Sequence, residues 1–354
     1  MISALISLIL ACTPQGAPQD NPLPQIERAI RRASVALVET QREDGSFAPT
    51  GNRDLCRVAL TAMALWSLNE SPARGIEAER VERAAKFLLR HVRENGGIYD
   101  PERGLAVYTS GISARALRTL GPRGDWPELA RALGAVELFT YRRGAPESVV
   151  DAQAPGTEQA AHAAETARQL LPSTSDPARR RALEFLARCD VETLRNPARV
   201  RIAIPQSRAS AEDAFSYDDL LPFVYFELSP EQQLARRARA ALEKYYTPDR
   251  NPDLTKRYGA EGFGAGTQGL YYYYFVVAKA LSAMGEPKLV TADGVEHDWP
   301  RELATRILAA QRPDGTWANR DAQWWEAEPV LATSYAVLTL KLCHATLARA
   351  ASAR

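Results

Sequence analysis

The chain of 354 residues has no excess of one charge and no long apolar run, and it has few cysteines. Lys and Arg number 44 against 43 acidic residues, so the basic excess that drives binding to phosphate backbones is absent and nucleic acid is not an expected partner. No stretch of 18 apolar residues occurs, which excludes a bundle of membrane-spanning helices. Four widely spaced cysteines, three of them beyond residue 50, do not make a disulfide framework, and we interpret those three as buried thiols.

The signatures of several enzyme classes are missing as well. The sequence contains no Walker loop, no H-E-x-x-H, no G-x-S-x-G and no C-x-x-C pair. These patterns carry phosphate binding, zinc-dependent hydrolysis, serine nucleophiles and thiol redox chemistry respectively. The sequence therefore indicates no cofactor and excludes these mechanisms in their usual form.

The first part of the chain, residues 1–25, is a short apolar run followed by a stretch rich in Pro, Gln and Asn. The run ends in Ile-Leu-Ala-Cys at Cys12 and resembles a bacterial lipoprotein signal. This resemblance implies export, a lipid on Cys12, a polar tether to the membrane, and a cell-envelope protein that faces the periplasm. The alternatives are a misplaced start codon or an apolar tail packed on the domain.

An internal repeat determines the expected architecture. One apolar helix ending returns six times, at Leu68, Leu120, Leu171, Leu228, Met284 and Leu340, with successive spacings of 52, 51, 57, 56 and 56 residues. A small residue, or valine once, lies one helical turn before each ending and permits close helix packing. These residues are Ala64, Ala116, Ala167, Val224, Ala280 and Ala336.

Each of these helices is preceded by another that carries apolar residues at helical spacing and more charge. The pattern predicts six helical hairpins with a charged outer layer and an apolar inner layer. Because one hairpin cannot bury its own apolar face, the repeats must stack, and six pairs favour a closed ring. We predict an all-α fold, an α/α toroid over residues 26–345, with a C-terminal tail at 346–354.

Short motifs stand between paired helices. They are QREDGSF at 41–47 and QRPDGTW at 311–317, with weaker copies VRENGGI at 92–98 and YGAEGFG at 258–264. The acidic residue and glycine suit a turn, and the aromatic residue can pack on the outer helix. The motifs resemble the Q-x-x-D/E-G-x-F/W repeat of squalene-hopene cyclases and protein prenyltransferases. The chain is thereby identified as a member of the prenyltransferase and squalene-oxidase repeat family, whose toroids belong to terpenoid cyclases and protein prenyltransferases.

Two acidic residues match part of the acid motif of those cyclases. In the family, a D-x-D-D stretch at an inner-helix end supplies the aspartic acid that protonates an alkene. Ser216-Tyr217-Asp218-Asp219 corresponds to it without the first aspartate, so the resemblance implies Asp218 as the acid and Asp219 as its neighbour. The alternative is a helix cap, in which Ser216 and Asp219 form a capping box.

Prenyltransferases also bind zinc through D-x-C at an inner-helix start and a later histidine. Asp54 and Cys56 have that spacing, and His162 lies farther on, but the histidine expected in the following repeat is absent. A buried free cysteine at a helix start is the commoner case, so we expect no metal.

Aromatic and acidic residues around the last two inner helices are candidates for ligand binding. Aromatic rings bind apolar chains, sugar rings and cations. Consecutive residues lie about 100° apart on a helix, so only one or two tyrosines of the run 271–274 can face a cavity. The ligand-binding candidates are Tyr217, Tyr271, Tyr274, Trp324, Trp325 and Glu326. Asp298, before Trp299 and Pro300, is expected to cap a helix.

Three functions remain open. The first is a cyclase-like or prenyltransferase-like toroid of the envelope that binds, and as an enzyme would transform, an apolar isoprenoid-type ligand. The second is a non-catalytic, lipid-anchored scaffold for a protein or glycan partner. The third is a glycan-active hydrolase or lyase, in which Asp218 or Asp219 would face Glu326 or Glu328 across the mouth of the ring.

Overall fold

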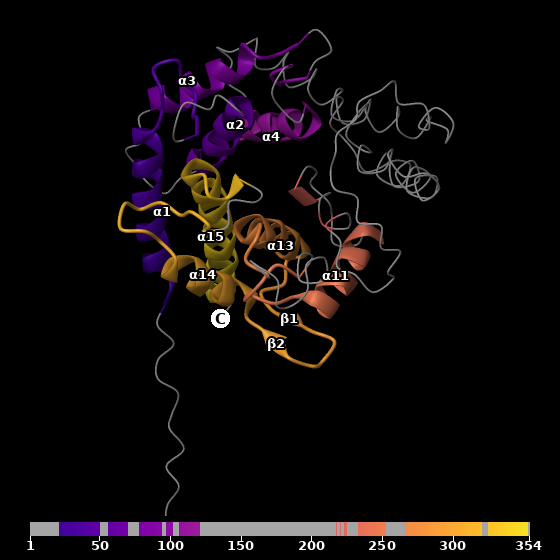
Figure 1. Cartoon of the computed structure of the whole chain (residues 1–354). Helices are drawn as coiled ribbons and strands as arrows, with labels where there is room; N and C mark the ends of the chain where they lie inside the picture. The colour runs from indigo at the N-terminus through magenta and orange to yellow at the C-terminus, as the bar shows by residue number, and fades with distance from the viewer. Residues whose placement is uncertain are drawn as a thin grey trace, which may run out of the picture.

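The computed structural model describes residues 21–49, 56–69, 78–93, 97–101, 106–120, 217, 220, 223–224, 233–252, 266–320 and 325–352. In this part of the chain 64% of residues are helical and 3% lie in strands, which confirms the predicted all-α class. The helices form an inner and an outer layer of an α/α toroid (Figure 1).

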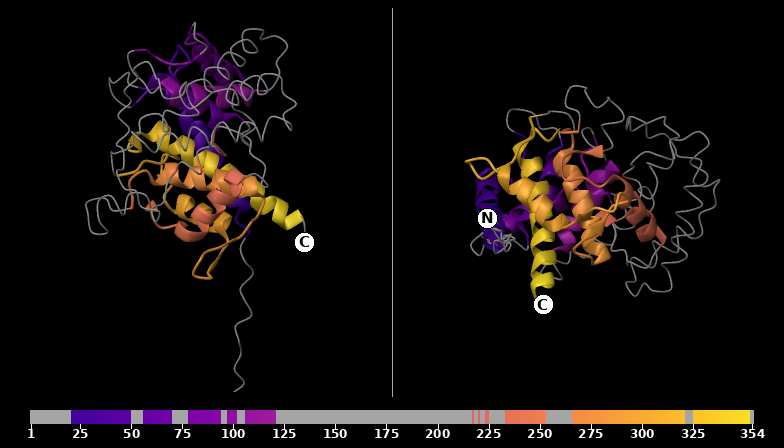
Figure 2. Two further views of the ribbon diagram at one scale, coloured as in Figure 1. Left: turned by 90° about the vertical axis from the view of Figure 1, so that its right-hand side faces the viewer. Right: turned by 90° about the horizontal axis from the view of Figure 1, so that it is seen from below.

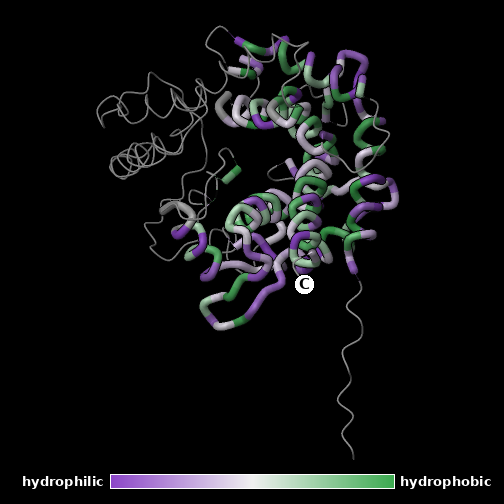
Figure 3. Tube along the Cα trace, turned by 180° about the vertical axis from the view of Figure 1, so that it is seen from behind, coloured by the Kyte–Doolittle hydropathy of each residue, from purple (hydrophilic) through white to green (hydrophobic). Residues whose placement is uncertain are grey.

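Four inner helices are described: α2 (Arg57–Leu68), α4 (Ala106–Arg118), α13 (Leu270–Met284) and α15 (Pro329–Ser352). They pack side by side in the order α13, α15, α2, α4. Residues on every side of α2, α13 and α15 are buried, because inner helices contact neighbours on both flanks and an outer helix behind. In Figure 3 the apolar residues follow α15 through the middle of the molecule.

Four outer helices accompany them: α1 (Leu23–Glu39), α3 (Ala78–Leu89), α11 (Gln233–Tyr245) and α14 (Trp299–Ala309). Each carries its apolar residues on one face, and the charged residues lie on the other, as α1 shows by burying six residues at helical spacing. The outer helices pack behind the inner ones, α3 on α2, α11 on α13 and α14 on α15. The predicted division into layers is therefore confirmed for these hairpins.

The small residue near the end of each inner helix is buried, as the repeat predicted. Ala64, Ala116, Ala280 and Ala336 are fully buried, and Val224 is 2% exposed. A larger side chain there would hold the helices apart. Ala167 lies outside the described residues.

The last repeat packs against the first. Helix α15 packs on both α1 and α2, as Figure 2 shows from two further sides. Lys341 Nζ donates to the carbonyl of Ser67 at 2.7 Å, and His344 Nε2 lies 3.0 Å from Glu27 Oε1. An open solenoid would leave these end faces to solvent, so the contacts between chain ends identify a closed ring.

The two Q-x-x-D-G motifs, at 41–47 and 311–317, each join their own hairpin to the outer helix of the next repeat. The side-chain amide of Gln41 donates to the carbonyl of Arg80 on α3 at 2.8 Å. That of Gln311 donates at 3.0 Å to the carbonyl of Ala29 on α1. The second bond connects the sixth repeat to the first, so the motif that joins neighbouring repeats also joins the two ends of the ring.

Each motif is also fastened to its own inner helix. The backbone N–H of Phe47 donates to Thr61 Oγ1 at 2.9 Å, and that of Trp317 donates to Thr333 Oγ1 at 3.0 Å. In the weak second copy Ser110 Oγ accepts from the N–H of Ile98. A hydroxyl near the start of the inner helix thus satisfies a buried N–H, which is costly to leave unpaired. The expectation that these motifs support the fold agrees with this geometry.

A two-stranded hairpin precedes α14 and was not expected from the sequence. Its strands are β1 (Leu289–Val290) and β2 (Glu296–His297), paired antiparallel around a turn at Asp293 and Gly294. An Asp-Gly pair favours such turns, but two-residue strands carry no alternation that reveals them. The hairpin replaces a plain loop between repeats five and six.

Helix α15 continues to Ser352, into the stretch expected to be a tail. By length and composition its 24 residues could cross a membrane, since the mean hydropathy of its most apolar 18-residue window is 1.3. Because 72% of that window is buried inside the protein, α15 has the character of a core helix. Before that stretch, α15 packs on α1, where His344 meets Glu27.

Candidate functional site

Aromatic side chains from separate inner helices meet inside the ring. Tyr272, in the first turn of α13, lies 5.3 Å from the ring of Tyr217 and 5.6 Å from that of Tyr335 on α15, measured between centroids. Phe275, one turn along α13, stacks on Tyr335 at 5.7 Å and meets Trp66 of α2 edge-on at 5.3 Å. We call the set the aromatic face: Trp66, Tyr108, Tyr217, Tyr272, Phe275 and Tyr335.

The aromatic face has a buried floor and a partly accessible edge. Phe275, Tyr335 and Trp66 are 1%, 4% and 7% exposed, whereas Tyr108, Tyr217 and Tyr272 are only half-buried. The three accessible tyrosines come from the starts of inner helices or, for Tyr217, from the segment before residues 218–219. The arrangement leaves ring surface partly accessible at the edge, above a packed floor.

A buried carboxyl group lies at the start of α13, beside the aromatic face. Glu326 is fully buried; its Oε1 accepts from the backbone N–H of Tyr272 at 2.7 Å and its Oε2 accepts from Asn319 Nδ2 at 2.9 Å. Gly269, which precedes the helix, has no side chain to cap it, so Glu326 supplies the cap from a distant segment. Burial raises the pKa of Glu326 to about 7, although these hydrogen bonds oppose the rise.

A buried cation lies close to the floor. Arg115 of α4 is 9% exposed, and its guanidinium carbon stands 5.6 Å from the centroid of the Trp66 ring. At that distance the ring face attracts the positive charge. The aromatic face therefore has one carboxyl group at its edge and one guanidinium group behind its floor.

The structure places the predicted ligand-binding residues in different surroundings. Tyr217 belongs to the aromatic face, and Glu326 lies beside it. Tyr271 meets Tyr274 edge-on at 6.5 Å, and the hydroxyl of Tyr274 donates to the carbonyl of Pro248 at 2.7 Å, on the side of the segment after α11. Trp325 is 42% exposed and adopts a φ of 62°, a strained backbone for a large residue.

Other candidates fall outside the described residues. These are Asp218, Asp219, Trp324, Asp54, His162 and Cys12. Their proposed roles, in acid catalysis, ligand binding, metal binding and lipid attachment, stay predictions.

Cys56 directly precedes α2 and has a left-handed conformation, with a φ of 59°. Burial raises the pKa of its thiol, so the thiol is neutral at physiological pH. Among the described residues no group of three His, Cys, Asp or Glu side chains has the geometry of a metal site.

Five residues of the aromatic face were missed by the sequence analysis. A signal was present for two of them, because Tyr108 and Tyr272 each lie 12 residues before an inner-helix ending, Leu120 and Met284. Residues at equal positions in a repeat occupy equal positions in the ring. Trp66, Phe275 and Tyr335 have no shared repeat position, and only side-chain contacts across helices identify them.

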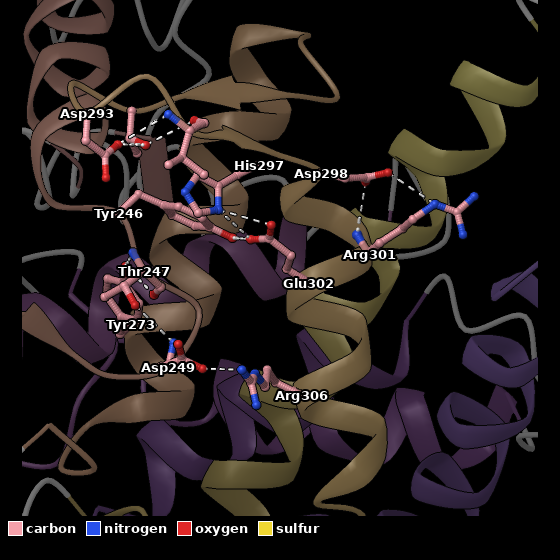
Figure 4. Close-up of polar contacts among 12 residues, drawn as sticks. Tyr246, Thr247, Asp249, Tyr273, Asp293, His297, Asp298, Arg301, Glu302 and Arg306 are labelled. Carbon is pink, nitrogen blue, oxygen red and sulfur yellow. Dashed lines mark hydrogen bonds and ion pairs between the residues drawn. The ribbon is translucent and has the colours of Figure 1, made fainter. Parts of the chain in front are cut away.

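A second polar group lies in the outer layer, where the hairpin meets α14 (Figure 4). Glu302 accepts from the hydroxyl of Tyr246 at 3.0 Å, and His297 Nδ1 lies 3.0 Å from the same carboxylate. Asp298 caps α14 by accepting from the N–H of Arg301, as its sequence context predicted. These contacts hold the hairpin and the end of α11 against α14. The segment His297-Asp298-Trp299 therefore has a structural role.

Comparison with known proteins adds little. No protein-family model matches the sequence, and no curated protein matches it significantly. Among solved structures, the chain is similar to the type II terpene cyclase MstE from Scytonema, a variant form in complex with its product merosterolic acid A. The TM-score is 0.48 and the identity 14%, over 92% of this chain and 98% of that chain. A similarity of this size says nothing about what this chain binds.

Proposed function

We propose that this toroid binds an apolar, isoprenoid-type ligand against its aromatic face. The observation that carries the proposal is the position of Tyr108, Tyr217 and Tyr272, half-buried inside the ring above a floor of Phe275 and Trp66. Rings held in this way contribute apolar area at little cost in side-chain entropy, and their π faces attract the double bonds or positive charge of an isoprenoid.

The position of Tyr272 makes it the residue to test. Its ring touches those of Tyr217 and Tyr335 and therefore joins two parts of the aromatic face. Removing the ring in Tyr272→Ala takes away roughly 2 kcal/mol of apolar contact, which corresponds to about thirtyfold weaker binding. We expect this loss for farnesene, a hydrocarbon of isoprene units, measured by equilibrium dialysis with the full chain.

Tyr245→Ala is the matched control, because Tyr245 is a half-buried tyrosine at the end of the outer helix α11. It should leave farnesene binding unchanged. Equal losses in both variants, or no binding of farnesene to the unaltered protein, would argue against a ligand on the aromatic face and in favour of the scaffold function.

The catalytic part of the proposal assigns the acid role to Asp218, with Asp219 beside it. Both follow Tyr217 in the sequence, and Tyr217 belongs to the aromatic face. A general acid contributes about a hundredfold or more to a rate, so Asp218→Asn should abolish turnover while leaving binding intact. The measurement is mass spectrometry of lipids that co-purify with each form: substrate should accumulate in Asp218→Asn, and an identical lipid profile in both forms would rule out this acid.

A further inference from the structure

Two tyrosine hydroxyl groups of the aromatic face are bonded to each other across the ring. Tyr108 stands in the first turn of α4 and Tyr335 in the second turn of α15, and their Oη atoms lie 2.6 Å apart. Helices α4 and α15 both pack on α2, and the bond between the two hydroxyl groups links α4 to α15 directly. The rings of Tyr272 and Phe275 lie against Tyr335 and surround this pair with apolar surface.

The two hydroxyl groups carry two hydrogens, and the hydrogen bond between them uses only one. Burial raises the pKa of Tyr108 to about 12 and that of Tyr335 well above its ordinary value, so both hydroxyl groups are protonated at neutral pH. One O–H donates to the other oxygen, and the second O–H is left to donate elsewhere. Within the described part of the chain, neither oxygen has a hydrogen-bond partner besides the other tyrosine.

The buried surroundings favour an acceptor for this second hydrogen. Tyr335 is 4% exposed, and a buried donor without an acceptor costs more free energy than a satisfied one. A donor that is itself hydrogen-bonded is polarised by that bond, which strengthens the next one in a low-dielectric setting. Tyr108 is half-buried and belongs to the partly accessible edge of the aromatic face.

We propose that the Tyr108–Tyr335 pair donates a hydrogen bond to an oxygen atom of the ligand. The site then selects an oxygen-bearing apolar molecule, such as an isoprenoid alcohol, over the hydrocarbon with the same skeleton. This inference rests on the proposed function and adds the polar group that the ligand must carry. A pure hydrocarbon would leave the donor unpaired, and that cost sets the preference.

The test compares farnesol with farnesene, which share their chain of isoprene units and differ in the hydroxyl group. In equilibrium dialysis with the full chain, we expect farnesol to bind about tenfold more tightly than farnesene. The double variant Tyr108→Phe with Tyr335→Phe removes both hydroxyl groups and keeps both rings. It should bind farnesene as before and farnesol no better than farnesene. Each single variant keeps one hydroxyl group with its hydrogen, so each should retain part of the preference.

Tyr274→Phe is the matched control, because it removes a buried tyrosine hydroxyl group outside the aromatic face whose hydrogen is already donated to the carbonyl of Pro248 at 2.7 Å. It should leave the preference for farnesol intact. Circular dichroism of each variant checks folding, and replacing both partners of a buried hydrogen bond by rings of similar shape is nearly neutral for stability.

The outcomes separate the two proposals. Equal binding of farnesol and farnesene by the unaltered protein overturns the donor role and leaves the aromatic site standing. Binding of neither probe overturns both proposals. A preference that survives in the double variant, or disappears in Tyr274→Phe, assigns the donor to another group and overturns the role of Tyr108 and Tyr335.

Discussion

Gly45→Ala is expected to destabilise the protein by about 3 kcal/mol, because the new methyl group would meet the backbone of the next repeat. Gly45 has a φ of 88°, which L residues other than glycine rarely adopt. A Cβ there would lie 2.3 Å from the carbonyl oxygen of Arg83 on α3. Helix α3 would have to move away from the motif, and the bond from Gln41 to Arg80 would stretch with it.

Two other glycines separate the backbone cost from the clash. Gly294, at the hairpin turn, has a φ of 83° with nothing within 4 Å of a Cβ, so Gly294→Ala measures the backbone term alone, about 1 kcal/mol. Gly315, in the second motif, would place its Cβ 3.0 Å from the carbonyl oxygen of Arg32 and should fall between the two. Urea denaturation gives the order of the three losses, and equal losses would mean that the close approach of the repeats contributes nothing.

The contribution of Glu326 to stability should fall by about 3 kcal/mol as the pH rises from about 4 to 8. Its pKa is raised from 4.5 to about 7 in the folded protein, chiefly by burial. Between these values the folded state keeps a proton that the unfolded chain releases. The stabilisation is complete below pH 4.5 and is lost as the pH passes through 7.

Glu326→Gln isolates this contribution, because the amide has nearly the same shape and does not titrate. The free energy of unfolding is measured in urea at several pH values for both forms. We expect the difference between the two forms to change with pH by about 3 kcal/mol in favour of the unaltered protein at low pH. A difference independent of pH would show that Glu326 stays ionised throughout and acts only as the cap of α13.

The architecture was predictable because its signals are local and repeated. The helix endings at Leu68 and Leu340 recur at a fixed spacing, and the motifs around Gly45 and Gly315 contain the turn residues that their backbone requires. Hydrophobic periodicity distinguished the outer from the inner helices, because burial on one face and burial on all faces leave different patterns. The β1–β2 hairpin was missed, since strands of two residues leave no period.

The candidate site was predictable only in part. The run of tyrosines at 271–274 indicated an aromatic wall, but its periodicity did not say which member faces the inside of the ring. The structure joins Tyr272 to the aromatic face, while Tyr273 and Tyr274 donate to the backbone carbonyls of Thr247 and Pro248. That choice depends on the rotation of α13 about its axis, which its contacts with α11 and α15 set.

The sequence by itself determined the repeat, the two helical layers and the turns between them, because each of these depends on residues close together in the chain. Only the tertiary structure decided how the ring closes, which carboxyl group caps α13, and which tyrosines meet. Gln311 and Ala29 lie 282 residues apart, Tyr108 and Tyr335 lie 227 apart, and Glu326 and Tyr272 lie 54 apart. Contacts at such separations depend on how six repeats stack, and that geometry is the sum of all packing interactions around the ring.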